Sequence, residues 1–197
     1  MARRVFFSFH YEPDVQRAQT VKNSWVTKSD REDAGFFDSS VFESKKRTSP
    51  DALKRFLDAG LLNSSVTCVL AGEHTHSRRW VRYEILRSFV EGKGLLNIAI
   101  HGVKNFEKKT AIAGLNPFSC LGAEVKGDVL RFKEKNGATW EWSADVPSMK
   151  LSSVRYSLNG RANFLLDVLF PSYDWASGDG YNKFPDWVER AAKAAGR

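Results

Sequence analysis

The chain has 197 residues and a formal net charge of +7, from 30 Lys and Arg against 23 Asp and Glu. Its length allows one sizeable hydrophobic core, and its 42% hydrophobic and 27% charged residues exclude an intrinsically disordered chain. No apolar run approaches the roughly 18 residues of a membrane span, and the apolar stretch at residues 5–9 is too short for a signal peptide. We therefore expect a cytoplasmic protein with no membrane partner, whose Cys68 and Cys120 are reduced thiols.

The positive charge is spread evenly along the chain. Residues 1–100 carry 16 Lys and Arg against 12 acids, and residues 101–197 carry 14 against 11. No run of five or six like charges occurs, and no zinc-finger or RNA-recognition motif accompanies the small basic clusters. This distribution predicts no nucleic-acid partner and is compatible with an anionic small molecule.

Short apolar runs alternate with helix-like segments over the first hundred residues. Strands are predicted at residues 5–9, 34–38, 65–70 and 95–100. Helices are predicted at residues 14–26, from Ser49-Pro50-Asp51 to a stop at Gly60, and from a Ser77 cap to about residue 91. This alternation predicts an α/β protein with a doubly wound, mainly parallel sheet of flavodoxin-like order 2-1-3-4-5.

The pattern changes after residue 101. A loop of about 25 residues precedes a predicted hairpin, in which residues 129–132 and 139–142 flank Asn136-Gly137. A helix is predicted at residues 161–169, and an aromatic-rich tail ends in an Ala-rich helix. We interpret the whole chain, 1–197, as a single domain with a core at about 1–105. The extension 106–197 is expected to pack its aromatic tail back on the sheet.

Ligands of open parallel sheets bind at the carboxyl ends of the strands, where the strand order reverses. Here His10 and Tyr11 follow the first strand, and residues 71–76 follow the third. The next helix carries Trp80 and Glu84, which are four residues apart and share one face. Glu84 points away from the apolar stripe of that helix, so its ordinary interpretation is a solvated glutamate. Beside Trp80 at this edge, however, desolvation would raise the pKa of the carboxyl group.

Several segments carry a resemblance to a known family. Residues 4–11 read RVFFSFHY, and residues 79–85 read RWVRYEI, which contains the spacing Trp80-x-x-x-Glu84. Together with residues 65–70, Asp174-Trp175 and residues 180–185, they resemble bacterial TIR-like proteins of the Thoeris antiviral defence type. The likeness extends over most of the chain, and the tryptophan–glutamate spacing matches TIR domains that cleave NAD.

The resemblance implies an enzyme that splits NAD⁺ at the nicotinamide–ribose bond and forms a cyclic ADP-ribose isomer. NAD⁺ is then a substrate, and no cofactor is expected. Glu84 would be the catalytic carboxylate, and Phe9, Tyr11 and Trp80 would be stacking walls. The cyclic product would activate a separate effector after a phage-derived trigger, and TIR domains generally assemble as homo-oligomers.

Other candidate residues have two interpretations each. His10 contacts substrate or serves the loop, and Ser8 contacts substrate or a neighbouring helix. Asp38 belongs to a loop over the pocket, as in TIR domains, or to a plain turn. His74 and His76 lack a third ligand of matching spacing, so no metal site is predicted, and Cys68 is assigned to the core. The basic residues 78, 79 and 82 would stand at the mouth of a pyrophosphate site.

Three other activities lack their motifs. The acidic residues of a phospho-receiver, the Gly-x-Gly-x-x-Gly turn of a dinucleotide oxidoreductase and the Gly-x-Ser-x-Gly turn of a serine hydrolase are absent. The remaining alternative is a non-catalytic TIR-like module, in which Trp80 and Glu84 shape a surface for protein–protein interaction and signalling. Release of nicotinamide from NAD⁺ discriminates between the two.

Overall fold

A five-stranded parallel sheet lies at the centre of the computed structural model, which describes residues 3–26, 31–33 and 49–197. Its order is β10-β4-β3-β1-β2, and every neighbouring pair is parallel. The strands are β1 (Arg3–Phe9), β2 (Arg31–Asp33), β3 (Val66–Ala71), β4 (Gly94–Ala99) and β10 (Ser172–Asp174). The predicted flavodoxin-like order is confirmed, with β10 as the fifth strand. The second strand predicted at residues 34–38 lies outside the described residues.

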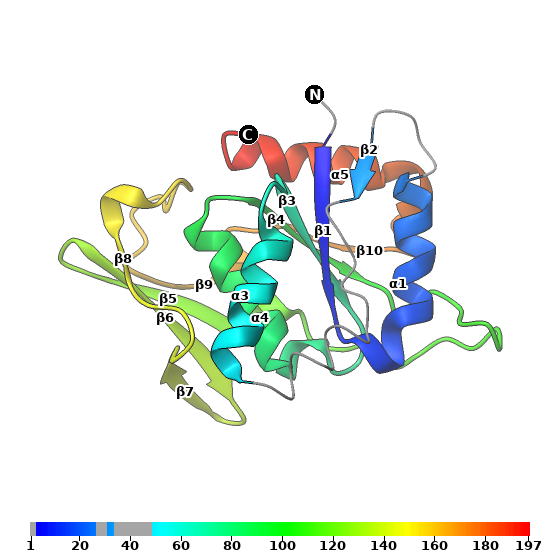
Figure 1. Cartoon of the computed structure of the whole chain (residues 1–197), viewed down its shortest axis with the longest axis horizontal. Coiled ribbons are helices and arrows are strands. Elements are labelled where there is room, and N and C mark those ends of the chain that lie inside the picture. The colour runs from blue at the N-terminus through cyan, green and yellow to red at the C-terminus, as the bar shows by residue number, and fades with distance from the viewer. Residues whose placement is uncertain (1–2, 27–30, 34–48) are drawn as a thin grey trace.

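Helices cover both faces of this sheet (Figure 1). On one face, α1 (Tyr11–Val26) and α5 (Gly180–Ala194) bury apolar side chains in one cluster with β1, β3 and β4. On the other, α3 (Pro50–Leu61) and α4 (Arg79–Val90) contribute to a second cluster that includes Val69 and Leu95. Because strand residues alternate between faces, the central strands are buried on both sides, as their continuous apolar runs predicted.

Two predicted helix ends differ from the structure. Ser49 caps α3 as predicted, since its hydroxyl accepts the Ala52 N–H at 3.1 Å, but the helix continues through Gly60 to Leu61. The predicted Ser77 cap is wrong. A short 3₁₀ turn, Thr75–Ser77, precedes α4, and the Ser77 hydroxyl donates to a carbonyl oxygen within this turn region instead. Ser77 therefore lies too early in the chain to accept an N–H of α4.

A second, antiparallel sheet has the order β7-β6-β5-β9. Its strands are β5 (Leu121–Lys126), β6 (Val129–Asn136), β7 (Thr139–Trp142) and β9 (Asn163–Leu165), and β8 (Met149–Lys150) pairs with β6. The hairpin around Asn136-Gly137 is confirmed. The helix predicted at residues 161–169 is wrong, because β9 pairs with β5 and a 3₁₀ turn, Leu166–Val168, follows. Pairing with β5 buries Phe164 and so outweighs the local helical pattern.

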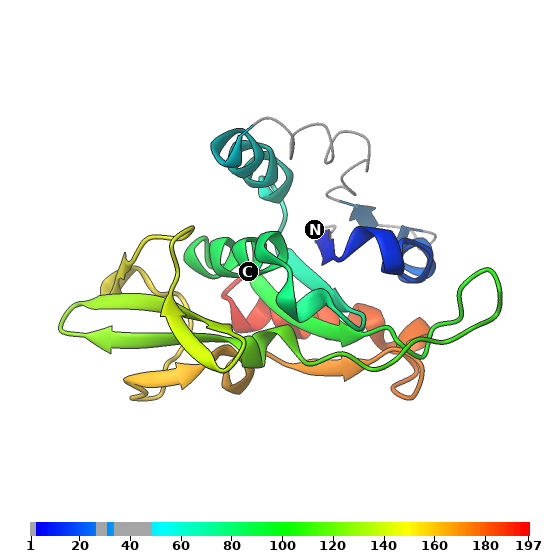
Figure 2. The ribbon, with the colours of Figure 1, turned by 90° about the horizontal axis from the view of Figure 1, so that it is seen from below.

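The two sheets share one hydrophobic cluster. The inner face of the second sheet packs on α4, where the rings of Phe132 and Phe89 lie 5.3 Å apart and edge-on. Seen from two directions, the second sheet forms one end of the molecule, and the loop at residues 101–116 projects from the other (Figure 2). The C-terminal helix α5 also packs into the core. Its Phe184 side chain is 1% exposed, and the ring centroids of Phe184 and Trp25 lie 5.2 Å apart. The prediction that the aromatic tail packs back on the sheet is confirmed.

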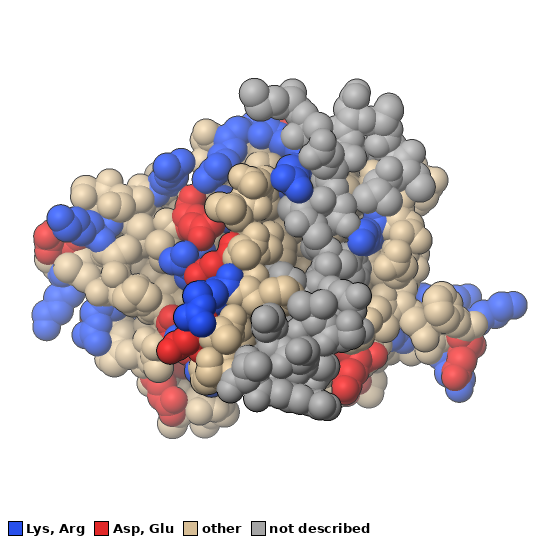
Figure 3. Space-filling view, viewed as in Figure 1, with Lys and Arg blue, Asp and Glu red and all other residues tan. Residues whose placement is uncertain are grey.

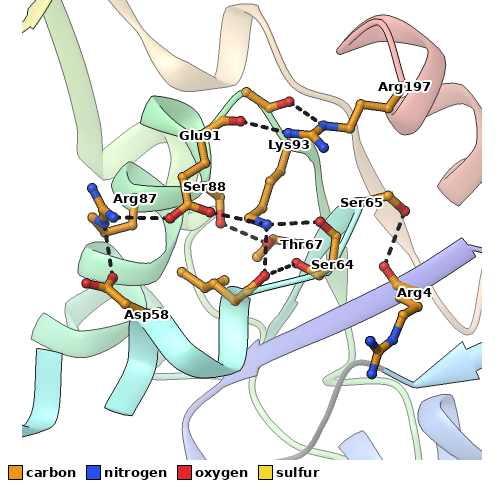
Figure 4. A network of polar contacts seen from close by, with 12 residues as sticks. Arg4, Asp58, Ser64, Ser65, Thr67, Arg87, Ser88, Glu91, Lys93 and Arg197 are labelled. Atoms are coloured by element: carbon orange, nitrogen blue, oxygen red, sulfur yellow. Dashed lines mark hydrogen bonds and ion pairs between the residues drawn. The ribbon is translucent and has the colours of Figure 1, made fainter. Parts of the chain in front are cut away.

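A polar network fixes the end of α4 that leads into β4 (Figure 4). The buried Lys93 ammonium donates to the carbonyl oxygens of Leu61 and Ser64, at 2.8 and 2.9 Å, and pairs with Glu91 at 3.2 Å. The Arg197 guanidinium donates to the Glu91 carbonyl oxygen at 2.9 Å. The Lys93 bonds satisfy carbonyl groups at the end of α3, and the Arg197 bond satisfies one at the end of α4, so the network ties α4 to α3 and to the C-terminal residue.

Candidate functional site

A carboxyl group and a hydroxyl group meet beneath the carboxyl edge of the central sheet. Ser8 is the penultimate residue of β1, and its hydroxyl donates to the Glu84 carboxylate of α4. Alternation along β1 directs Val5 and Phe7 to the α1 and α5 side, so Ser8 points to the opposite face, where α4 lies. The strand order reverses at β1, between β2 and β3, and the pair therefore lies at the predicted switch point.

Glu84 is not a solvated glutamate. Its side chain is 5% exposed, because α4 is buried on two sides. One side carries the predicted apolar stripe, including Ile85 and Phe89, into the second hydrophobic cluster. The other faces the sheet and is polar: Glu84 contacts Ser8, and one turn later the Ser88 and Thr67 hydroxyls lie 2.8 Å apart. Each buried polar group of this strip thus has a partner, as burial requires.

Burial makes Glu84 a weaker acid than an exposed glutamate. Loss of hydration raises the pKa of the carboxyl group from 4.5 to about 8, and the hydrogen bond from Ser8 opposes that rise. At neutral pH the carboxyl group is therefore largely protonated. A nearby positive charge would favour its ionised form, so the site is suited to a cationic group or to a positive charge that develops during a reaction.

A second buried carboxyl group lies at the same edge. Asp14, in the first turn of α1, is 2% exposed, and burial raises its pKa to about 6. The Thr75 hydroxyl donates to Asp14 at 3.4 Å and accepts the Gly72 N–H at 2.9 Å. A Cβ atom on Gly72 would lie 2.1 Å from an Asp14 oxygen, so only glycine allows this approach. Sequence reasoning placed Asp14 merely at the start of a helix and missed its burial.

The aromatic candidates divide into two groups. Phe9 and Tyr11 continue from β1 into α1, and their rings stack at 6.0 Å with His10 between them in the chain. All three are half-buried at the carboxyl end of β1. Trp80 is also half-buried, but it packs against the second hydrophobic cluster, edge-on to Tyr83 at 5.9 Å and beneath the Arg79 guanidinium at 4.7 Å. The structure thus joins Ser8 to Glu84 and Phe9 to Tyr11. Asp38 lies outside the described residues.

The expectation for the basic residues at the start of α4 is wrong in part. Arg79 donates two hydrogen bonds to Asp145, at 2.6 and 2.7 Å, and Lys54 joins the same carboxylate at 3.0 Å. Arg82 donates to the His76 carbonyl oxygen at 2.9 Å and lies 3.8 Å from Glu134. Arg79 is therefore paired with an acid of the extension, and Arg82 is engaged by His76 of the core and Glu134 of the extension.

The cysteines and histidines are the remaining candidate residues named from the sequence. Cys68 and Cys120 are buried free thiols, and burial raises the pKa of Cys68 far above its ordinary value, which confirms its assignment to the core. His74 faces Glu73 at 3.5 Å. Within residues 3–26, 31–33 and 49–197, no three His, Cys, Asp or Glu side chains are grouped as metal ligands. No helix in those ranges has the length and apolar character needed to cross a membrane.

The parallel sheet and the buried glutamate at its switch point define a TIR-like domain. Residues 6–105 match the family model described as Thoeris protein ThsB, TIR-like domain. The chain is also 43% identical over 192 residues to a Bacillus cereus (strain MSX-D12) protein named "Putative cyclic ADP-D-ribose synthase ThsB1", covering 95% of this chain and 100% of the relative. The chain belongs to the ThsB family of TIR-like Thoeris proteins, and the family resemblance seen in the sequence is confirmed.

Proposed function

We propose that this protein is an NAD⁺-cleaving enzyme that breaks the nicotinamide–ribose bond and closes the ADP-ribosyl group into a cyclic isomer. The observation that carries the proposal is the buried Glu84 carboxyl group, held by Ser8 at the switch point of the sheet. The name of the relative, "Putative cyclic ADP-D-ribose synthase ThsB1", supports the class of product.

The chemistry of the bond suits a desolvated glutamate. The nicotinamide ring of NAD⁺ is cationic, and its departure moves positive charge onto the ribose. Either charge would lower the pKa of Glu84 from about 8, so substrate binding itself would favour the carboxylate form. The carboxylate then stabilises the developing oxocarbenium charge and accepts hydrogen bonds from ribose hydroxyl groups. Ser8 holds the carboxyl group in place and is a positioning residue unless it also contacts the substrate.

Cyclisation needs a folded substrate and little water. The stacked rings of Phe9 and Tyr11 form an aromatic surface at the carboxyl end of β1, on which a base of the dinucleotide can stack. Exclusion of water by such a surface favours attack by the other end of the substrate over hydrolysis. Trp80 contributes through its packing against the second hydrophobic cluster. His10 and Asp38 remain proposed substrate contacts.

The cyclic nucleotide would act on a separate effector, and a phage-derived trigger and self-assembly would control its formation. The experiment is product analysis by mass spectrometry in phage-infected cells that express the wild type, Glu84→Gln or Glu141→Gln. Glu141 is an exposed glutamate of the second sheet and serves as the matched control. Nicotinamide release and a cyclic product are expected from the wild type and Glu141→Gln alone. A fully active Glu84→Gln variant would reject the assignment, and no product from any of the three would favour the non-catalytic interaction module.

A further inference from the structure

The second sheet has a basic and aromatic outer face. Paired residues of an antiparallel sheet project from the same side, and the register pairs Trp142 with Lys133, Trp140 with Lys135 and Val129 with Lys126. Arg131 alternates with Lys133 along β6 and shares their side. We define the outer face by six residues: Lys126, Arg131, Lys133, Lys135, Trp140 and Trp142. Leu130 and Phe132 point to the opposite side and are buried against the core.

The two indoles of this face are exposed to solvent and lie beside cationic side chains. Trp140 is 40% and Trp142 is 45% exposed. The Arg131 guanidinium lies 4.0 Å from the Trp142 ring centroid, and the Lys133 ammonium lies 5.7 Å from that of Trp140. These contacts confirm that cations and indoles share one side. Two exposed tryptophans on one strand are costly in water, which favours a ligand for the surface.

The charge of the outer face is largely uncompensated. Among the described residues, Lys126, Arg131, Lys133 and Lys135 form no ion pair, whereas Arg79 and Arg82 on α4 both face acids of the extension. Glu124, opposite Arg131, is an acid on this side. Lys and Arg side chains project from the end of the molecule that the second sheet forms (Figure 3). An even distribution along the chain therefore conceals a local concentration of charge, because the strand period separates the cations in sequence.

We propose that the outer face binds single-stranded nucleic acid. Bases of a single strand stack on exposed aromatic rings, and cations beside the rings contact the phosphates. Trp140 and Trp142, two residues apart on an extended strand, are separated by roughly 6.8 Å along it, so each indole can take one base. This surface faces away from α4 and is independent of the proposed NAD⁺ site. The expectation of no nucleic-acid partner rested on the absence of a run of like charges along the sequence, and this proposal replaces it.

The same features fit other macromolecules less well. Lysine is depleted in protein–protein interfaces, yet three of the four cations of the outer face are lysines. The hairpin turns through Gly137 and Ala138, so its tip carries no large apolar side chain for insertion into a lipid surface. Exposed indoles also suit the unpaired bases of a single strand better than the paired and stacked bases of a duplex.

The test is fluorescence anisotropy of the full chain with labelled oligo(dT) and oligo(rU) of about 16 nucleotides, the upper site size of a comparable sheet surface. The triple variant Arg131→Gln/Lys133→Gln/Lys135→Gln should weaken binding at least tenfold. It should also reduce the slope of log K against log salt concentration by about 2, because each of three lost phosphate contacts contributes about 0.7 to that slope. The matched control is Lys104→Gln/Lys108→Gln/Lys109→Gln, which removes the same charge from the loop at the opposite end (Figure 2). Its affinity should remain near that of the wild type.

The indoles provide a second, charge-neutral comparison. Trp140→Ala and Trp142→Ala should each weaken binding about fivefold or more, whereas Trp→Phe at either position should retain most of the affinity because a ring remains. Circular dichroism melting confirms that each variant is folded. An equal loss of affinity in the outer-face triple variant and the control triple variant would overturn the proposal. Tighter binding of a duplex than of a single strand, or binding to anionic vesicles without binding to oligonucleotides, would also overturn it.

Discussion

Replacement of Glu84 by Gln tests the burial of the proposed catalytic group through stability. Gln keeps the size of the side chain and can still accept the Ser8 hydrogen bond, but it carries no ionisable group. Burial raises the pKa of the carboxyl group from 4.5 to about 8 in the folded state, and a tenfold change in a protonation equilibrium corresponds to about 1.36 kcal/mol. Ionisation of Glu84 therefore costs the folded wild type about 1 kcal/mol at pH 5, about 3 kcal/mol at pH 7 and about 5 kcal/mol well above pH 8.

The sign follows from the proton balance. Between pH 4.5 and 8 the folded state holds a proton on Glu84 that the unfolded state has lost, so the stability of the wild type falls as pH rises through this window. Glu84→Gln lacks this loss and should be more stable than the wild type by about 3 kcal/mol at pH 7, with little difference near pH 4.

Urea unfolding of the wild type and Glu84→Gln at pH 4.5, 6, 7 and 8 measures this difference. Glu141→Gln, at an exposed glutamate, is the control and should follow the wild type at every pH. A difference in unfolding free energy between Glu84→Gln and the wild type that stays constant across these pH values would refute the desolvated carboxyl group. If Glu84→Gln is more stable than the wild type and releases no nicotinamide, the Glu84 carboxyl group serves function and lowers the stability of the fold.

Four further substitutions probe the surroundings of the site. Trp80→Ala should lower turnover in a folded protein and cost about 2 kcal/mol in urea unfolding, since the indole is only half-buried; unchanged kinetics would limit Trp80 to packing. Ser8→Ala should raise the pKa of Glu84 further and shift the pH profile of nicotinamide release upward, and an unmoved profile would exclude Ser8 as its partner. Gly72→Ala should cost more than about 2 kcal/mol because its Cβ overlaps Asp14, and Asp14→Ala in the same chain should restore part of the loss in a double-mutant cycle.

Local pattern was most informative where one residue type has one conformational role. Ser49 caps its helix, the hairpin forms at the Asn136-Gly137 signal with Gly137 in its turn, and the continuous apolar runs form the central strands, because these signals act over a few residues. The incorrect elements depended on distant partners. Residues 161–169 have a helical pattern, but Phe164 gains more by pairing β9 with β5 and entering the core.

The candidate site likewise has features that the sequence predicts and features that only the fold creates. The spacing of Trp80 and Glu84, and the position of Ser8 near the end of β1, could be predicted from the sequence. The burial of Glu84 could not, because a helix with one evident apolar stripe gives no sign that its polar side also lies against a sheet. Asp14 was missed for the same reason, since only the fold brings the Gly72 turn over it.

The sequence by itself determined the parallel α/β sheet, the family and the carboxyl group proposed for catalysis, because the alternation of strands and helices, the helix caps and the short motifs are encoded locally. The tertiary structure alone decided the electrostatics. It buried Glu84 with Ser8 and raised its pKa, it matched Arg79 and Arg82 with acids of the extension, and it gathered separated cations and two indoles on one sheet face. Dielectric environment and charge proximity depend on distances in space, which the order of residues along the chain does not contain.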